Sequence, residues 1–178
     1  RMLQIIGLFL RHNYAITFLS AAAKSAFSAD LDLLSVATKN IELNAESFDA
    51  EMKQLNPDIV LFDRFMMEEQ YGWRVLENCP NALRILDTED LHFLRKAREV
   101  AFKQNKLLIF EDYISDVFKR EMASIYRCDL TLLISKFEME LAVETFKIDA
   151  SLLYYLPFLN EHNSIEIPDF SERKHFIS

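Results

Sequence analysis

Glycine is nearly absent from this sequence, which has only Gly7 and Gly72 among its 178 residues. Loops that wrap a phosphate group use several glycines, because the backbone must approach the ligand closely and adopt conformations that other residues avoid. No such loop can be built here. Any nucleotide chemistry must therefore use another device or another domain.

An excess of basic residues is also missing, since the net charge is −8 and the pI is about 5.0. Neutralising the phosphates of a nucleic acid requires a basic surface, so the composition argues against a nucleic-acid partner. Cysteine is scarce too. Cys79 and Cys128 have neither CxxC spacing nor a partnering histidine, which predicts two reduced thiols in a cytoplasmic protein, with no metal site and no bound cofactor.

No apolar run reaches the roughly 18 residues that a membrane span needs. The apolar start, Met2 to Leu10, is interrupted by Gln4 and followed by Arg11 and His12. It also lacks the small-residue cleavage site of a signal peptide.

What is present is the composition of an ordinary folded protein, with 51% hydrophobic and 27% charged residues. The length predicts one compact unit with a single core. Strands are predicted at 14–19, 39–43, 58–62, 82–86, 130–134 and 152–155. Helices are predicted at 2–12, in the first half of 21–34, from Ser47, a candidate N-cap, to 55, and at 68–77, 91–104, 113–126 and 135–146. This alternation predicts an α/β fold whose parallel sheet is covered by helices on both faces.

Polar side chains follow two of these predicted strands directly. Asp63 and Arg64 come after PDIVLF, and Asp87 and Asp90 come after ALRIL. In an open parallel sheet, ligands bind beyond the carboxyl ends of the strands. We therefore expect these side chains at the rim of a cleft.

The charged residues after the first of these strands also have a structural interpretation. Glu68 and Glu69 suit the positive N-terminal end of a helix. Arg64 can pair with Glu69 or Asp87, or bind an anionic ligand through its forked donors.

His92 and Ser135 stand at the beginnings of two predicted helices. The positive end of the helix dipole biases a histidine toward its neutral form. A neutral His92 can exchange hydrogen bonds with a ligand hydroxyl, with Asp87 or Asp90 holding its tautomer, although a lone histidine is more often structural. Ser135 and Glu138 fit a capping box, and a contribution of Ser135 to the cleft is the alternative.

Five basic residues lie in or just after the predicted helix at 91–104, although the chain as a whole is acidic. They are Arg95, Lys96, Arg98, Lys103 and Lys106. A solvated helix face explains this pattern. The alternative is docking to anionic lipid or an anionic glycan, which exposed apolar residues beside these charges would favour.

Three stretches resemble, in order and position, the amino-terminal domain of glycosyltransferase family 4 enzymes, which have the two-domain GT-B architecture. These stretches are PDIVLFDRFMMEEQYGWRV, ALRILDTEDLHFLRKARE and REMASIYRCDLTLLISKFEMELA. The resemblance implies that residues 1–156 form a Rossmann-like domain, one half of a GT-B fold, without the family's first strand and its glycine-containing loop. Residues 157–178 then correspond to a linker and the beginning of a carboxy-terminal domain.

The resemblance also implies a function, the transfer of a sugar from a nucleotide-sugar donor to a hydroxyl of a glycan, lipid-linked or protein acceptor. In this family the amino-terminal domain shapes the acceptor side of the cleft, and the carboxy-terminal domain holds the nucleotide sugar. The chain alone is therefore expected to be inactive. A polar residue or histidine often follows the strand that ALRIL matches, and this position maps onto Asp90, Leu91 and His92.

From this resemblance we expect His92 to be the catalytic residue of a cytoplasmic enzyme that can contact the inner membrane face. The expected substrate contacts are Asp63, Arg64, Glu69, Asp87, Asp90 and Ser135. Two other functions remain open. A pair of carboxylates in the cleft would favour a sugar-nucleotide epimerase of GT-B type, and a magnesium-binding phosphoacceptor aspartate would favour a non-catalytic binding or signalling module with a doubly wound sheet.

Overall fold

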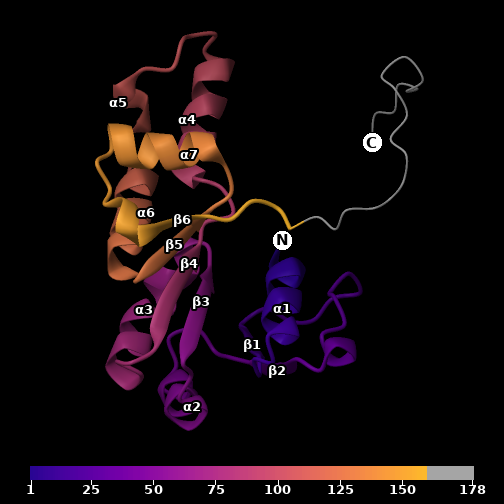
Figure 1. The fold of residues 1–178 in the computed structure, drawn as a ribbon. Coiled ribbons are helices and arrows are strands. Elements are labelled where there is room, and N and C mark those ends of the chain that lie inside the picture. The colour runs from indigo at the N-terminus through magenta and orange to yellow at the C-terminus, as the bar shows by residue number, and fades with distance from the viewer. Residues whose placement is uncertain (160–178) are drawn as a thin grey trace, which may run out of the picture.

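The computed structural model describes residues 1–159 and contains two parallel sheets (Figure 1). The smaller sheet pairs β1 (Thr17–Ser20) with β2 (Ala37–Asn40). The larger sheet has its strands in sequence order, β3 (Ile59–Asp63), β4 (Leu83–Asp87), β5 (Leu130–Leu133) and β6 (Leu153–Tyr155). The predicted α/β class, with parallel strands flanked by helices, is confirmed. The expected linker and domain start at 157–178 lie almost entirely outside the described residues.

Helices connect these strands and pack along the sheet. They are α1 (Met2–Arg11), α2 (Ser47–Leu55), α3 (Phe65–Asn78), α4 (His92–Lys103), α5 (Phe110–Tyr113), α6 (Asp116–Arg127) and α7 (Lys136–Glu140), with short 3-10 segments at Asp32–Leu34 and Ala150–Leu152 and a π-helical turn at Leu141–Thr145. Two of these helices, α6 and α7, begin at a serine N-cap. The Ser115 and Ser135 side chains accept hydrogen bonds from backbone N–H groups in the first turns of these helices. Helix α3 packs on β3 and β4, and α7 packs against β5 and β6.

Three local predictions are wrong. The alanine-rich stretch at 21–34 is helical only at its 3-10 turn, and residues 21–30 form exposed turns and bends. Alanine favours a helix only weakly, and a helix in a protein is stabilised mainly by an apolar face that it buries. Ser47 is the first residue of α2 and not its cap, which is Glu46. The helix expected at 113–126 is divided into α5 and α6 by the extended residue Ser115.

The buried hydrophobic side chains form two clusters, whereas the sequence predicts a single core. The large cluster joins the four-stranded sheet to its helices, and Phe93, Met52 and Leu86 are among its most buried members. The small cluster brings Ile6 of α1 against Val36, which precedes β2. Leu19 of β1 packs against the large cluster, so the two sheets are also in apolar contact.

The register of the larger sheet brings polar strand ends together. Asp63 of β3 is the partner of Asp87 of β4, and Leu132 of β5 is the next partner along the same row. In Figure 1, α3 runs beside the strands, while α4, α5 and α7 lie beyond the strand ends. We call this end of the sheet, comprising residues 63–64 and 87–92, the carboxyl edge.

Candidate functional site

Arg64 turns the chain from β3 into α3 in a strained backbone conformation. Its φ of 71° and ψ of 156° fall close to a region that is essentially restricted to glycine, where another residue costs on the order of 1–3 kcal/mol. Conformations of this kind cluster at functional sites. The Arg64 N–H donates to the Asp87 carbonyl oxygen at 2.8 Å. The ends of β3 and β4 are thus joined through their backbones at the strained turn.

The side chains of Asp63 and Arg64 form a loosely aligned ion pair at this turn. Arg64 Nε lies 3.4 Å from Asp63 Oδ1 and 3.8 Å from a carboxylate oxygen of Glu89. Neither Asp63 Oδ1 nor Arg64 Nε has an aligned hydrogen-bond partner among the described residues. The expected pairing of the Arg64 side chain with Glu69 or Asp87 is wrong. Both atoms are buried, and buried polar atoms usually have partners, so the unpaired atoms add to the strain at this turn.

Asp87 is buried and is held in an ion pair by Arg1. The Arg1 guanidinium donates to the carboxylate through Nε at 3.0 and 3.1 Å and through Nη2 at 2.9 Å. Its Nη1 donates to the carbonyl oxygen of Leu156, beyond β6, at 2.7 Å. A ligand would reach Asp87 only by displacing Arg1. Asp87 is thus a buried member of the carboxyl edge and, through Arg1, joins β4 to the segment after β6.

His92 is the first residue of α4, and its ring packs edge-on against Phe65 with centroids 5.4 Å apart. Nδ1 lies 3.1 Å from the Asp90 carbonyl oxygen. Because a carbonyl oxygen can only accept, Nδ1 carries the proton, and Nε2 of the neutral ring keeps its lone pair. Nε2 makes no hydrogen bond to any of residues 1–159. Asp90 thus sets the tautomer of the neutral ring through its backbone, and the His92 side chain as a whole is 12% exposed.

Glu121 of α6 binds the beginning of α4, where His92 lies. The sequence alone does not single out Glu121. This buried carboxylate accepts the backbone N–H groups of His92 and Phe93, each at 3.1 Å, and so caps α4 from another helix. Its Oε1 is 3.6 Å from His92 Nδ1, the distance of an ion pair and longer than a hydrogen bond. Glu121, helped by Asp90 and opposed by burial, raises the pKa of His92 above its ordinary value of 6.5. Glu121 thus favours the protonated ring, against the bias toward the neutral form that the position of His92 in its helix predicts.

Ser135 is confirmed as the cap of α7. Its Oγ accepts the Glu138 N–H at 3.1 Å and donates to Glu138 Oε2 at 2.9 Å. The other oxygen of the buried Glu138 accepts the Leu91 N–H at 2.9 Å, where a full capping box would use the Ser135 N–H. Ser135 therefore positions Glu138, and Glu138 in turn holds the loop that precedes His92.

The remaining acidic residues that the sequence singled out are engaged in ion pairs. Asp90 pairs with Arg95 at 3.0 Å. Glu69 pairs with Arg120 at 2.6 Å, and the Arg120 guanidinium lies 5.2 Å from the centre of the Phe65 ring, the same ring that contacts His92. The acids near the carboxyl edge thus position neighbouring side chains.

Glu68 lies in the first turn of α3, as its helix-dipole interpretation predicts, but it is buried and pairs with Arg127 of α6 at 2.5 Å. The pair raises the pKa of Arg127. Gly72, one turn later, makes room for the carboxylate, because a Cβ at that position would lie 2.4 Å from Glu68 Oε1. Glu68 therefore fixes α3 against α6 and takes no part in a surface site.

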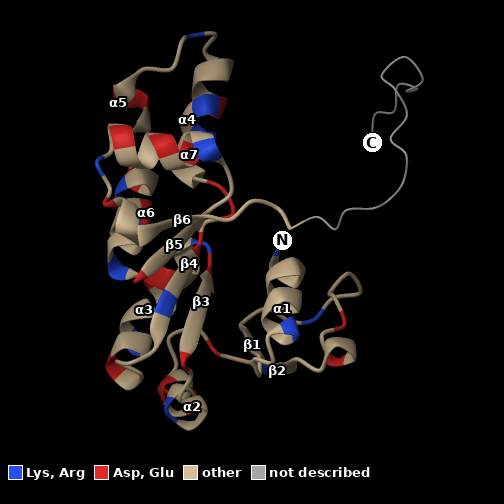
Figure 2. Cartoon of the chain, viewed as in Figure 1, with Lys and Arg blue, Asp and Glu red and all other residues tan. Residues whose placement is uncertain are grey.

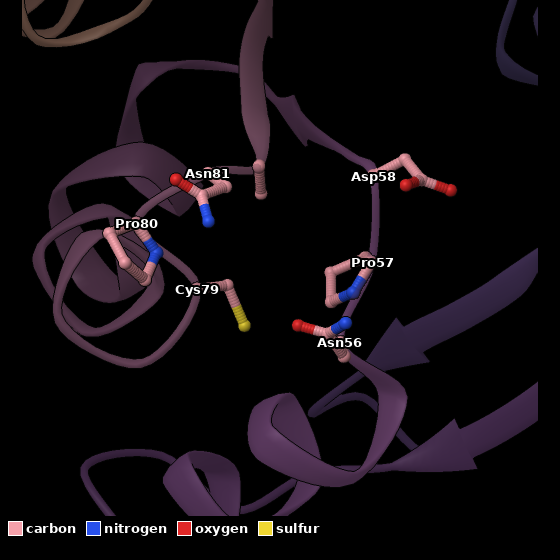
Figure 3. A pocket seen from close by; sticks show the side chains of 7 residues that line it. Asn56, Pro57, Asp58, Cys79, Pro80 and Asn81 are labelled. Atoms are coloured by element: carbon pink, nitrogen blue, oxygen red, sulfur yellow. The ribbon is translucent and has the colours of Figure 1, made fainter.

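A shallow pocket of about 110 Å³ lies at the opposite end of the larger sheet (Figure 3). Asn56, Asp58, Cys79 and Asn81 are among the residues that line it, and they precede β3 and β4. Cys79 and Cys128 are both free thiols. Burial raises the pKa of Cys79, so its thiol is protonated and poorly nucleophilic. This pocket is separate from every residue that the sequence predicts for the site.

No family model, curated protein or solved structure matches the chain in comparisons with known proteins. Over residues 1–159, no helix is long and apolar enough to cross a membrane. The same part of the chain holds no group of three or more His, Cys, Asp and Glu side chains arranged to bind a metal ion.

Proposed function

We propose that this chain forms the acceptor side of a GT-B glycosyltransferase, with the carboxyl edge as one wall of the cleft. The observation that carries the proposal is the state of His92. Its ring is held by Asp90 and Glu121, while Nε2 has no hydrogen-bond partner within residues 1–159. A hydroxyl-bearing ligand at the end of a parallel sheet would meet this nitrogen.

The proposed reaction moves a sugar from a nucleotide sugar to an acceptor hydroxyl. The bond between the anomeric carbon and the diphosphate oxygen breaks, a bond from that carbon to the acceptor oxygen forms, and the nucleoside diphosphate leaves with the bonding electron pair. His92 Nε2 accepts a hydrogen bond from the acceptor hydroxyl and receives its proton as the new bond forms. Glu121 raises the pKa of His92, which makes the neutral ring a stronger base toward the acceptor hydroxyl.

The other residues of the edge have distinct roles in this proposal. Arg64 and Asp63 contact the acceptor directly, because their side chains are partly exposed at the carboxyl edge. Asp87, Asp90 and the more distant Glu69 and Ser135 are expected to act as positioning residues, since each already has a partner in the chain. The donor would be held mainly by the second domain of a two-domain enzyme.

The proposal includes a cytoplasmic location and no bound cofactor. Two free cysteines support the location, because reduced thiols are usual in the cytoplasm and rare in secreted proteins. The acceptor class, a glycan, a lipid-linked sugar or a protein, stays open.

The test is sugar transfer by the full-length protein, with release of nucleoside diphosphate measured over a panel of nucleotide sugars. His92→Ala should reduce kcat/KM by about 100-fold or more, the usual contribution of a positioned acid or base. His12→Ala is the matched control, because His12 is exposed at the end of α1. Equal turnover by the two variants, with both folded, would remove His92 from the mechanism.

A further inference from the structure

We propose that the connection between α4 and α5 is a membrane-docking tip that binds the surface of an anionic lipid bilayer. The tip consists of four apolar side chains, Phe102, Leu107, Ile109 and Phe110, with exposed fractions of 88%, 90%, 55% and 50%. Apolar side chains of this size are seldom left in water together unless they bind something. This surface is independent of the transferase proposal.

The tip projects from the molecule. In Figure 1 the α4–α5 connection is an extremity of the fold, on the side beyond the carboxyl edge and away from both sheets. A small ligand is normally held in a concave pocket, whereas a projecting loop can enter the interface of a bilayer. The projecting shape therefore favours the surface of a lipid bilayer over a small molecule as the partner.

Basic residues precede the tip, and two acidic residues follow it. Residues 95–106 carry five basic side chains and one acidic one, whereas Glu111 and Asp112 come directly after Phe110, so residues 95–112 have a net charge of +2 in a chain of −8 (Figure 2). Lys103 pairs with Glu99, and Lys106 pairs with Asp112 at 2.6 Å. The Lys103–Glu99 pair is exposed on both sides, and such pairs are weak, so lipid phosphates can replace Glu99. Lys96 has no ion pair among the described residues.

The combination of lysine and large apolar residues favours lipid over a protein partner. Lysine is depleted in protein interfaces, but its long side chain can lie along an apolar surface while its ammonium group reaches the headgroups. Phenylalanine and leucine beside lysine and arginine are typical of segments that lie in the membrane interface. Exposed apolar residues therefore lie beside the basic helix, which is the arrangement that favours lipid docking.

The test is flotation of the protein with vesicles of phosphatidylcholine alone or with about one third phosphatidylserine, a fraction chosen to give a strongly anionic surface. The wild type should bind the anionic vesicles, and binding should fall as salt is raised because the attraction is screened. Phe102→Ser combined with Leu107→Ser should weaken binding at least about tenfold through the lost apolar insertion. Phe27→Ser is the matched control, since Phe27 is 99% exposed in a loop far from the tip, and should bind as the wild type does.

A second set of variants tests the charge separately. Lys96→Ala, Lys103→Ala and Lys106→Ala together should weaken binding to anionic vesicles and leave any weak binding to phosphatidylcholine unchanged. Three outcomes would overturn the proposal: no binding by the wild type, equal binding by the tip variant and the Phe27→Ser control, or self-association that the tip variant abolishes without any vesicle binding. The last outcome would assign the tip to contact between copies of the chain.

Discussion

Replacing Glu121 by Gln should destabilise the protein and at the same time change the titration of His92. The buried carboxylate accepts two backbone N–H groups at 3.1 Å, and each hydrogen bond to a charged acceptor contributes roughly 1.5–3 kcal/mol. The glutamine amide keeps one acceptor oxygen for one of the two backbone N–H groups. Its NH2 group faces the other backbone N–H, which is left without an acceptor. Removing a buried charge recovers part of this loss, so the expected net decrease in the free energy of unfolding is about 2 kcal/mol.

The loss of stability caused by Glu121→Gln should depend on pH, because Glu121 interacts with a titrating side chain, His92. Because Glu121 raises the pKa of His92 in the folded state above 6.5, the stabilising contribution is fully present below the unfolded pKa. It is lost as pH rises through the higher folded pKa. Urea denaturation followed by circular dichroism should therefore show a larger loss for Glu121→Gln at pH 5.5 than at pH 8.

Asp116→Asn is the matched control, since it makes the same carboxylate-to-amide change at an exposed position of the same helix. It should change the free energy of unfolding by at most about 1 kcal/mol. The reasoning would be refuted if Glu121→Gln lost no more stability than this control, or if the His92 titration followed by NMR were the same in both variants.

Three further changes follow from the geometry of the fold. Arg64→Gly should stabilise the protein by about 1 kcal/mol relative to Arg64→Ala in urea denaturation, because glycine relieves the strained turn. Asp87→Ala should destabilise it by about 3–5 kcal/mol, since it leaves Arg1 buried without its carboxylate; a smaller loss would show that water reaches the guanidinium. Burial, reinforced by Glu68, raises the pKa of Cys128 to about 12, so iodoacetamide at pH 8 should label this thiol only after unfolding, as mass spectrometry would show.

The sequence predicts the larger sheet well because its strands are short apolar runs bounded by polar residues. The positions of Asp63, Asp87 and His92 at the strand ends follow from that pattern and from the common direction of parallel strands. The predicted helix in 21–34 fails because alanine content alone does not provide an apolar face to bury.

The partners of the site residues could not be predicted, because they come from distant parts of the chain. Arg1 and Asp87 are 86 positions apart, and Glu121 and His92 are 29 apart. One local signal does mark Glu121. It lies on the apolar stripe of α6 with Met122 and Ile125, which are buried as it is, and a carboxylate on a buried helix face requires a partner.

The most direct test of the account is an NMR titration of the histidine side chains in the full-length protein with candidate acceptors and a nucleotide sugar. The account predicts that the Nε2 resonance of His92 shifts when an acceptor that supports transfer is added, while the His12 resonances stay unchanged. Transfer that proceeds with no change at His92 would contradict the proposed role of the carboxyl edge.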